Sequence, residues 1–264
     1  MRTLVHLSDL HFGRLDPAIL RPLRETVQRI APDVVVVSGD LTQRARPDEF
    51  EQAREFLSTL PQPQIVVPGN HDVPLHNLYA RLYLPLRSYR RYISDDLEPY
   101  YEDDEIAILG LNTTRSLVWK NGRINMRQVA AVEQRFCGAA NVIKALVTHH
   151  PFDLPEHYSH RDLVGRAHQA MPRIARCGID LLLAGHFHIS HTGHTAMRYR
   201  IPGHSAIFVQ AGTLSERRRG EENSFNRIQI ERREIVVQRY ACGALDSGFH
   251  VVAEERFRSG GDGR

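Results

Sequence analysis

The stretch LVHLSDLHFG, residues 4–13, joins an apolar run to two polar side chains. Leu4, Val5 and Leu7 are typical of a strand buried on both faces of a sheet, because such strands are continuous apolar runs of about four to eight residues. Asp9 and His11 follow at once, although burying such groups is costly unless they are paired or bind a metal. We therefore expect this strand to deliver polar groups to one edge of a sheet.

Further apolar runs resemble the first and alternate with helical patterns. Strands are predicted at 3–7, 33–37, 64–67, 106–110, 142–148 and 180–184. Apolar positions at helical spacing follow Asp16-Pro17, Pro47, Met126 and Leu163. This alternation predicts an α/β fold with a largely parallel sheet. After about residue 190 the pattern changes to consecutive strands without helices between them, expected at 205–211, 225–230, 234–241 and 249–257.

Length and charge limit the function classes. The 264 residues are enough for a large core, and we expect one domain over residues 1–258 with a disordered tail at 259–264. The 34 basic and 31 acidic side chains leave a net charge of +3, which gives no support for a nucleic-acid-binding face. We expect a monomer or a homodimer that forms no stable nucleic-acid complex.

The cysteines and the hydropathy pattern suggest a compartment. Cys137, Cys177 and Cys242 lack CxxC spacing, so we expect reduced core cysteines of a cytoplasmic protein. The sequence shows no signal peptide, and no apolar run approaches the roughly 18 residues of a transmembrane helix.

Polar residues follow five of the predicted strands, and 15 histidines are available to supply them. Ligands in open parallel sheets bind beyond the carboxyl ends of the strands, so these side chains are expected at one edge. Residues two apart in an extended chain point to the same side, which would let Asp9 and His11 converge, and likewise His186 and His188. The candidate residues are Asp9, His11, Asp40, Asn70, His71, Asp72, His149, His150, His186 and His188.

Each short motif alone has a structural explanation. Lone histidines at strand ends more often make hydrogen bonds, Asp40 could cap a helix, and Asn70 and Asp72 could be turn residues. Five strand ends with the same bias are not independent accidents. Among the candidates, two Asp, one Asn and four His make seven possible ligands. This number exceeds the four of a tetrahedral zinc site and suits two ions that share a carboxylate. The absence of a thiolate among them favours Mn, Fe, Zn or Co, and two such ions suit phosphoryl transfer.

The residues in this order resemble the calcineurin-like metallophosphoesterase superfamily. Its pattern is D-x-H, G-D, G-N-H-D/E, H and G-H-x-H, and every element is present here between residues 9 and 188. The resemblance implies a four-layer α/β/β/α sandwich, in which two facing mixed β-sheets are flanked by helices. It also implies two divalent or mixed-valence metal ions as cofactors.

The resemblance assigns a role to each motif residue. Asp9, His11 and His188 would hold the first metal, Asn70, His149 and His186 the second, and Asp40 would bridge them. His149 is preferred to His150 because the family ligand is the histidine of an H-x-P segment. His71 would contact the phosphate and assist the leaving oxygen, and Asp72 would support His71.

The phrases HLSDLHFG, GDLTQRA and PGNHD are most similar to bacterial class III cyclic-nucleotide phosphodiesterases. This similarity implies hydrolysis of a small phosphodiester by attack of a metal-bound hydroxide, with 3′,5′-cyclic AMP as the leading substrate. The alternatives are a phosphodiesterase or pyrophosphatase of a lipid-linked or other nucleotide, of the UDP-diacylglucosamine type, and a nuclease of the same superfamily.

Two segments could shape the substrate pocket. Residues 73–103, rich in tyrosine and arginine, could cover the site and stack on a base, or could form an amphipathic helical pair broken near Pro85. The buried stripe of that pair would be Leu78, Leu82, Leu86, Tyr89 and Ile93. A membrane-bound helix is a third possibility, but it requires an exposed apolar stripe. In the second segment, residues 152–166, the basic side chains His157, His160, Arg161 and Arg166 could hold a phosphate or ribose, or face water.

Overall fold

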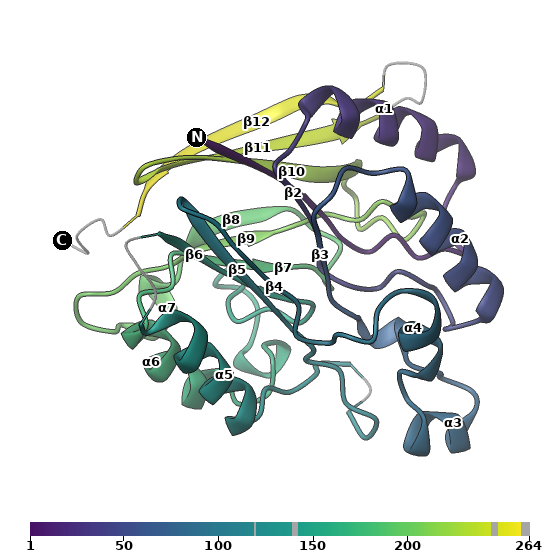
Figure 1. Ribbon diagram of the computed structural model, residues 1–264, viewed down its shortest axis with the longest axis horizontal. Helices are drawn as coiled ribbons and strands as arrows, with labels where there is room; N and C mark the ends of the chain where they lie inside the picture. The colour runs from purple at the N-terminus through teal and green to yellow at the C-terminus, as the bar shows by residue number, and fades with distance from the viewer. Residues whose placement is uncertain (119, 139–141, 244–247, 260–264) are drawn as a thin grey trace.

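The computed structural model describes residues 1–118, 120–138, 142–243 and 248–259, and its strands form two sheets of six (Figure 1). The first sheet contains β1 (Arg2–Leu7), β2 (Val34–Val37), β3 (Gln64–Val66), β10 (Asn223–Glu231), β11 (Glu234–Cys242) and β12 (His250–Arg258). The second contains β4 (Tyr100–Glu102), β5 (Ile106–Leu111), β6 (Ile143–Thr148), β7 (Leu181–Ala184), β8 (His191–His194) and β9 (Ile207–Gln210).

Helices connect the strands and cover the sheets. They are α1 (Leu20–Ile30), α2 (Pro47–Ser58), α3 (Leu78–Tyr83), α4 (Arg87–Tyr92), α5 (Met126–Phe136), α6 (Ala167–Arg176) and α7 (Ala196–Tyr199). Three short 3₁₀ helices are η1 (Pro17–Ile19), η2 (Asn70–Asp72) and η3 (His160–Asp162). Among the described residues, no helix has both the length and the apolar character needed to cross a bilayer.

Both sheets are mixed, and the parallel strands form one half of the first sheet and the centre of the second. The first sheet runs β12-β11-β10-β1-β2-β3, and β1, β2 and β3 are parallel to one another. The second runs β4-β5-β6-β7-β9-β8, with β5, β6, β7 and β9 parallel and antiparallel strands at both edges. The predicted strands are all present, whereas β4 and β8 were not predicted. The interruption of the late strands by α7 was also not predicted.

The sheets face each other across an apolar core, and helices cover their outer faces. Side chains such as Leu4, Val36, Ile108 and Leu183 fill the space between the sheets. Figure 1 shows α1 and α2 on the outside of the first sheet, and α5 and α6 against the second. This is the expected α/β/β/α sandwich. A single domain over residues 1–258 stays a prediction, and 260–264 of the predicted tail lie outside the described residues.

The predicted helix starts have clear local causes. The Asp16 carboxylate accepts a hydrogen bond from Ala18 N before η1, and α2 begins at Pro47. Asn125 Oδ1 accepts from Gln128 N at the start of α5. The fourth helix begins at Ala167 and not near Leu163, which precedes it as a buried residue.

The prediction of three reduced cysteines is wrong. Cys137 and Cys177 form a disulfide that joins the ends of α5 and α6, while Cys242 is buried outside this bond. Both partners lie at helix ends that are 40 residues apart in the chain, so spacing gave no signal. Because these two cysteines form a disulfide, the cysteines no longer favour a reducing compartment.

The predicted helical pair between residues 78 and 93 is present as α3 and α4, but its stripe is only partly buried. Leu86 and Tyr89 are buried against the core, as predicted. Leu78 and Leu82 are instead 59% and 49% exposed, so the prediction of their burial is wrong. Apolar spacing identifies a common face of two short helices, and it does not say whether another element covers that face.

Tyr89 fixes α4 to the strand that leads into the third polar motif. Its side chain is fully buried, and its hydroxyl donates a hydrogen bond of 3.0 Å to Val66 O at the end of β3. Three residues further along the chain, Gly69 begins the polar turn. This contact therefore helps to hold the turn in place.

We predict that Tyr89→Phe lowers the free energy of unfolding by about 1–2 kcal/mol, because it leaves a buried carbonyl without its donor. Urea denaturation followed by circular dichroism measures this change. Tyr92→Phe is the matched control, because Tyr92 stacks on Phe50 with its ring alone, and it should change stability by less than about 0.5 kcal/mol. Equal effects of the two substitutions would contradict the anchoring role of the Tyr89 hydroxyl.

Candidate dinuclear metal centre

The predicted ligand residues lie in sharply turned backbone. Asp9, His11, Asp40, His186 and His188 all have positive φ angles, between 46° and 78°. The expectation that extended backbone aligns residues two apart is therefore wrong, and the left-handed conformation turns each side chain inward instead. This conformation costs roughly 1–2 kcal/mol per residue, so the surrounding structure must hold it.

Glycines and backbone hydrogen bonds allow the loops to meet. Gly39 has a φ of +91°, and a Cβ atom at Gly69 would lie 2.3 Å from Asp40 N, so neither position accepts a side chain without movement. Asp9 N donates to Gly39 O, and His11 N donates to Asp40 O. The ends of β1, β2 and β3 are thus joined directly through their backbones.

The first cluster consists of four buried donor atoms from three strand ends. Asp9 Oδ1 lies 3.1 Å from His188 Nε2 and 3.6 Å from His11 Nε2. The two histidine nitrogens are 3.2 Å apart, and His11 Nε2 is 3.7 Å from Asp40 Oδ2. Four donors around one ion with bonds of about 2.1 Å would lie about 3.4 Å apart in a tetrahedral arrangement. The observed spacing fits a single metal ion.

Hydrogen bonds around this cluster leave its inward atoms without partners. Asp9 Oδ2 accepts from Ser8 Oγ and from His186 N, whereas the buried Asp9 Oδ1 has no hydrogen-bond partner. His188 Nδ1 donates to Arg217 O, which directs its Nε2 lone pair toward His11 Nε2. A proton on one ring or a metal ion between the rings would satisfy these buried nitrogens.

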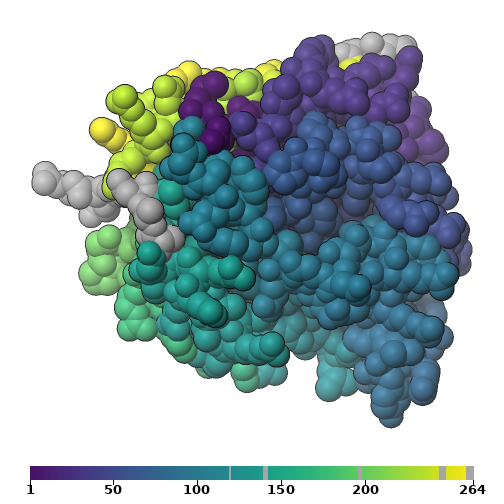
Figure 2. All heavy atoms as spheres, viewed as in Figure 1, coloured from purple at the N-terminus to yellow at the C-terminus, as the bar shows by residue number. Residues whose placement is uncertain are grey.

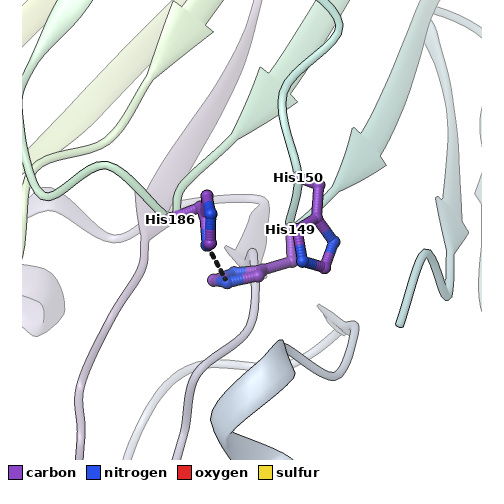
Figure 3. Close-up of side chains that lie close together, drawn as sticks. All are labelled: His149, His150 and His186. Atoms are coloured by element: carbon purple, nitrogen blue, oxygen red, sulfur yellow. Dashed lines mark hydrogen bonds between the residues drawn. The ribbon is translucent and has the colours of Figure 1, made fainter. Parts of the chain in front are cut away.

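The second cluster forms around His149. Its Nε2 atom lies 3.2 Å from Asn70 Oδ1, 3.2 Å from His186 Nδ1 and 3.4 Å from Asp40 Oδ2. Figure 3 shows the facing edges of the His149 and His186 rings. His149 Nδ1 donates to Ser38 O, so Nε2 carries the lone pair. Each of these three distances from His149 Nε2 is short enough for two ligands of one ion.

Asp40 belongs to both clusters. Its Oδ1 atom accepts a hydrogen bond of 2.8 Å from His71 N, which leaves Oδ2 to face His11 Nε2 on one side and His149 Nε2 on the other. A single carboxylate oxygen therefore lies between the two groups of donors. This is the position that a bridging ligand requires.

His150 lies beside the second cluster. Its ring is buried next to His149 (Figure 3), and its Nδ1 atom is 2.7 Å from Thr113 Oγ1. The nitrogens of His149, His150 and His186 are close enough to form a metal group of their own. However, the contacts with Asn70 and Asp40 are made by His149, which is the histidine that the motif favours.

The electrostatics of the centre match a cation site. Burial alone would raise the pKa values of Asp9 and Asp40, but His188 beside Asp9 and His149 beside Asp40 hold both well below their usual range. Burial alone would lower the pKa of His149, yet Asp40 raises it to about 9. The protein without metal thus keeps two ionised carboxylates and places a proton where positive charge is needed. A metal ion would take over that role.

His71 and Asp72 have separate surroundings. His71 Nδ1 donates to Gln43 O, and its Nε2 lies 2.8 Å from Arg217 Nη1. The Asp72 carboxylate accepts from Thr42 N, Thr42 Oγ1, Leu41 N and Gly69 N. Burial and Asp40 raise the pKa of Asp72 to about 7, against these hydrogen bonds. Asp72 therefore connects the two loops beside His71, while Gln43 O accepts the hydrogen bond from the His71 ring.

Sequence reasoning missed Arg217. It lies in the loop after β9, where no motif signals it other than the basic run ERRR at 216–219. Its carbonyl orients His188 and its guanidinium reaches His71, so it contacts two of the motif residues.

The segment 152–166 packs beside the centre. The Tyr158 ring contacts Phe187, which lies between His186 and His188, at 5.0 Å between ring centroids. His160 is exposed and lies 2.8 Å from His168, nitrogen to nitrogen. The structure therefore places one aromatic residue of this segment next to the ligand loop and turns His160 toward solvent.

Comparison with solved structures supports the same fold. The chain is similar to a dimetal phosphatase from Danio rerio, with a TM-score of 0.70, 13% sequence identity and coverage of 98% of this chain and 99% of that one. At this identity the likeness concerns the fold alone.

Three curated relatives share part of the sequence. Glycerophosphodiester phosphodiesterase GpdQ of Enterobacter lignolyticus is 32% identical over 56% of this chain and 56% of its own length. UDP-2,3-diacylglucosamine pyrophosphatase LpxG of Chlamydia trachomatis is 26% identical over 44% of this chain and 43% of its own. A probable cyclic nucleotide phosphodiesterase of Synechococcus is 33% identical over 27% of this chain and 32% of its own.

The chain thus matches about half or less of the length of each of these relatives. The family model of calcineurin-like phosphoesterases matches residues 2–190, a range that holds the four donors of each cluster. The chain belongs to the calcineurin-like phosphoesterase family.

Proposed function

We propose that the chain is a phosphodiesterase that acts with two divalent metal ions. The observation that carries the proposal is the position of Asp40 Oδ2 between two clusters of buried oxygen and imidazole donors. Asp9, His11 and His188 would hold one ion, Asn70, His149 and His186 the other, and Asp40 both. When bound, such a pair of ions ionises a water molecule and stabilises the charge of the phosphoryl transition state.

His71 and Arg217 would act on the substrate. Because His71 Nδ1 donates to a backbone carbonyl, the neutral ring presents its Nε2 atom on the opposite side. Arg217 Nη1 lies next to this atom, and the ring is 4.9 Å from the ring of His11 between centroids. A phosphate at the centre would therefore meet a guanidinium donor and an imidazole that can hold a proton near the leaving oxygen.

Two substrate candidates remain for this site. The sequence phrases around the motifs and the Synechococcus relative favour 3′,5′-cyclic AMP. The exposed leucines of α3, together with the relative LpxG, favour a lipid-linked diester as the second candidate.

Turnover by metal-free protein restored with Mn²⁺ tests the proposal. We expect rapid hydrolysis of bis(p-nitrophenyl) phosphate, slower hydrolysis of p-nitrophenyl phosphate, and hydrolysis of 3′,5′-cyclic AMP in preference to 2′,3′-cyclic AMP. Turnover of the artificial diester with none of either cyclic nucleotide would favour the second candidate. Metal binding without turnover of any of these compounds would contradict the hydrolase function.

Asp40→Asn should weaken the binding of both metals together, because the bridging oxygen loses its negative charge. Metal analysis after loading with Mn²⁺ and gel filtration measures the stoichiometry. Asp48→Asn removes an exposed acid from α2 and should retain the wild-type metal content. Loss of only one metal from Asp40→Asn would contradict the bridging role.

His71→Ala should retain the metals and lower kcat by about 10²–10⁴-fold, since it removes the proton donor to the leaving oxygen. Steady-state kinetics with bis(p-nitrophenyl) phosphate and metal analysis of the same sample measure both quantities. His76→Ala, which changes an exposed histidine nearby, serves as the control. Normal turnover by His71→Ala would remove His71 from the mechanism.

Arg217→Gln should lower kcat/KM for anionic diesters by about ten- to a hundredfold, because it removes a charge-assisted hydrogen bond of about 1.5–3 kcal/mol. The backbone carbonyl that orients His188 is retained, so metal content should stay unchanged. Arg219→Gln, an exposed neighbour in the same basic run, should behave as wild type. If both substitutions gave the same kinetics, Arg217 would not be a phosphate-binding residue.

A further inference from the structure

Exposed apolar side chains gather on one projecting part of the molecule. We call it the α3 knob; its members are Leu75, Leu78, Tyr79, Leu82, Tyr83, Leu84 and Leu117. Their exposed fractions range from 40% to 79%. Figures 1 and 2 show α3 and its surroundings standing out from the body of the sandwich at the lower right. A compact cluster of this kind marks an interaction surface, whereas isolated exposed leucines need no explanation.

Specific hydrogen bonds hold the knob in a defined conformation. Arg81 is 2% exposed, and its guanidinium donates to Ser116 O at 2.8 Å and to Pro74 O at 3.2 Å. Asn77 Oδ1 accepts from Ala80 N at the start of α3. Arg81 thereby fastens α3 to the loop that carries Leu117, the most exposed member of the knob. The leucines are held outward by these polar contacts.

The charges beside the knob are mainly basic, and the first acid after α4 in the chain, Asp95, is paired with Arg90 at 3.8 Å. Residues 73–92 contain four arginines and no acidic residue. Arg87, Arg90 and Arg91 are exposed on α4, directly after the knob in the chain. Apolar side chains next to arginines, with tyrosines among them, are the combination that suits the interface of an anionic bilayer.

We propose that the α3 knob binds the surface of an anionic lipid bilayer. Its leucines and tyrosine rings enter the boundary between headgroups and acyl chains, and the α4 arginines contact the headgroup phosphates. A second copy of the chain fits the surface less well. A twofold contact places the same patch on both sides, so the exposed arginines of α4 would approach one another, while Asp95 is already paired with Arg90.

The knob lies close to the metal centre in the chain. The η2 turn, which carries Asn70 and His71, leads through residues 73–77 into α3. A bilayer bound to the knob would bring its own phosphodiesters to this rim of the site. This consequence rests on the proposed function, whereas binding to the bilayer does not.

Sedimentation with lipid vesicles tests the proposal without any turnover. The full chain is mixed with vesicles of phosphatidylcholine, or of equal parts phosphatidylcholine and phosphatidylglycerol, at low and high salt. We expect binding to the anionic vesicles, weaker binding at high salt because the arginine contacts are screened, and little binding to phosphatidylcholine alone. Leu78→Ser/Leu82→Ser should bind roughly ten-fold more weakly or worse, because it removes apolar area.

A matched variant separates the knob from general hydrophobicity. Val251→Ser/Val252→Ser alters two residues that are 43% and 40% exposed on β12, and it should bind vesicles as the wild type does. Hydrolysis of soluble bis(p-nitrophenyl) phosphate by every variant is measured in parallel. Inactive protein that still binds vesicles would contradict the proposed function and leave the knob proposal intact.

Three results would overturn the knob proposal. The first is no sedimentation of the wild type with anionic vesicles. The second is equal sedimentation of the wild type and Leu78→Ser/Leu82→Ser. The third is a dimer in sedimentation velocity that this double variant dissociates, since the knob would then be a contact between two copies of the chain.

Discussion

The site depends on two buried carboxylates whose negative charge requires positive charge close by. Asp9 and Asp40 are 0% and 1% exposed, and histidine nitrogens surround their inward oxygens. A buried charge left without a partner costs about 3–5 kcal/mol. Protons on His149 and His188 can compensate in part, and two metal ions would do so fully. Metal ions between these donors would therefore account for the burial of both carboxylates.

The surrounding fold positions the two carboxylates and the histidines around them. Parallel strands from both sheets end in loops that backbone hydrogen bonds connect, and glycines such as Gly39 and Gly69 allow the close approach. Five ligand residues hold strained positive φ angles, which a flexible loop would not maintain. Asp72 accepts three hydrogen bonds from Leu41 and Thr42 in the neighbouring loop and a fourth from Gly69 in its own loop. The rigid sandwich below the loops maintains these strained backbone conformations.

The sequence predicted the sandwich, its main strands and the motif residues, because apolar runs and polar strand ends are local patterns. In the structure, seven of those residues lie in two adjacent groups around Asp40. The sequence alone could not predict the role of Arg217, which reaches His71 across 146 residues of chain and belongs to no motif. It gave the wrong state for Cys137 and Cys177, because their pairing depends on where two helices end. The periodicity also wrongly predicted that Leu78 and Leu82 are buried. Periodicity defines a common face of a helix, but tertiary packing decides whether that face is covered.

The central claim is that one carboxylate oxygen of Asp40 joins two metal ions. Electron paramagnetic resonance of the protein loaded with two equivalents of Mn²⁺ tests it most directly, because ions that share a bridging ligand are magnetically coupled. The account predicts a spin-coupled spectrum in place of the six-line signal of isolated Mn²⁺. An uncoupled spectrum at full occupancy would contradict a shared ligand.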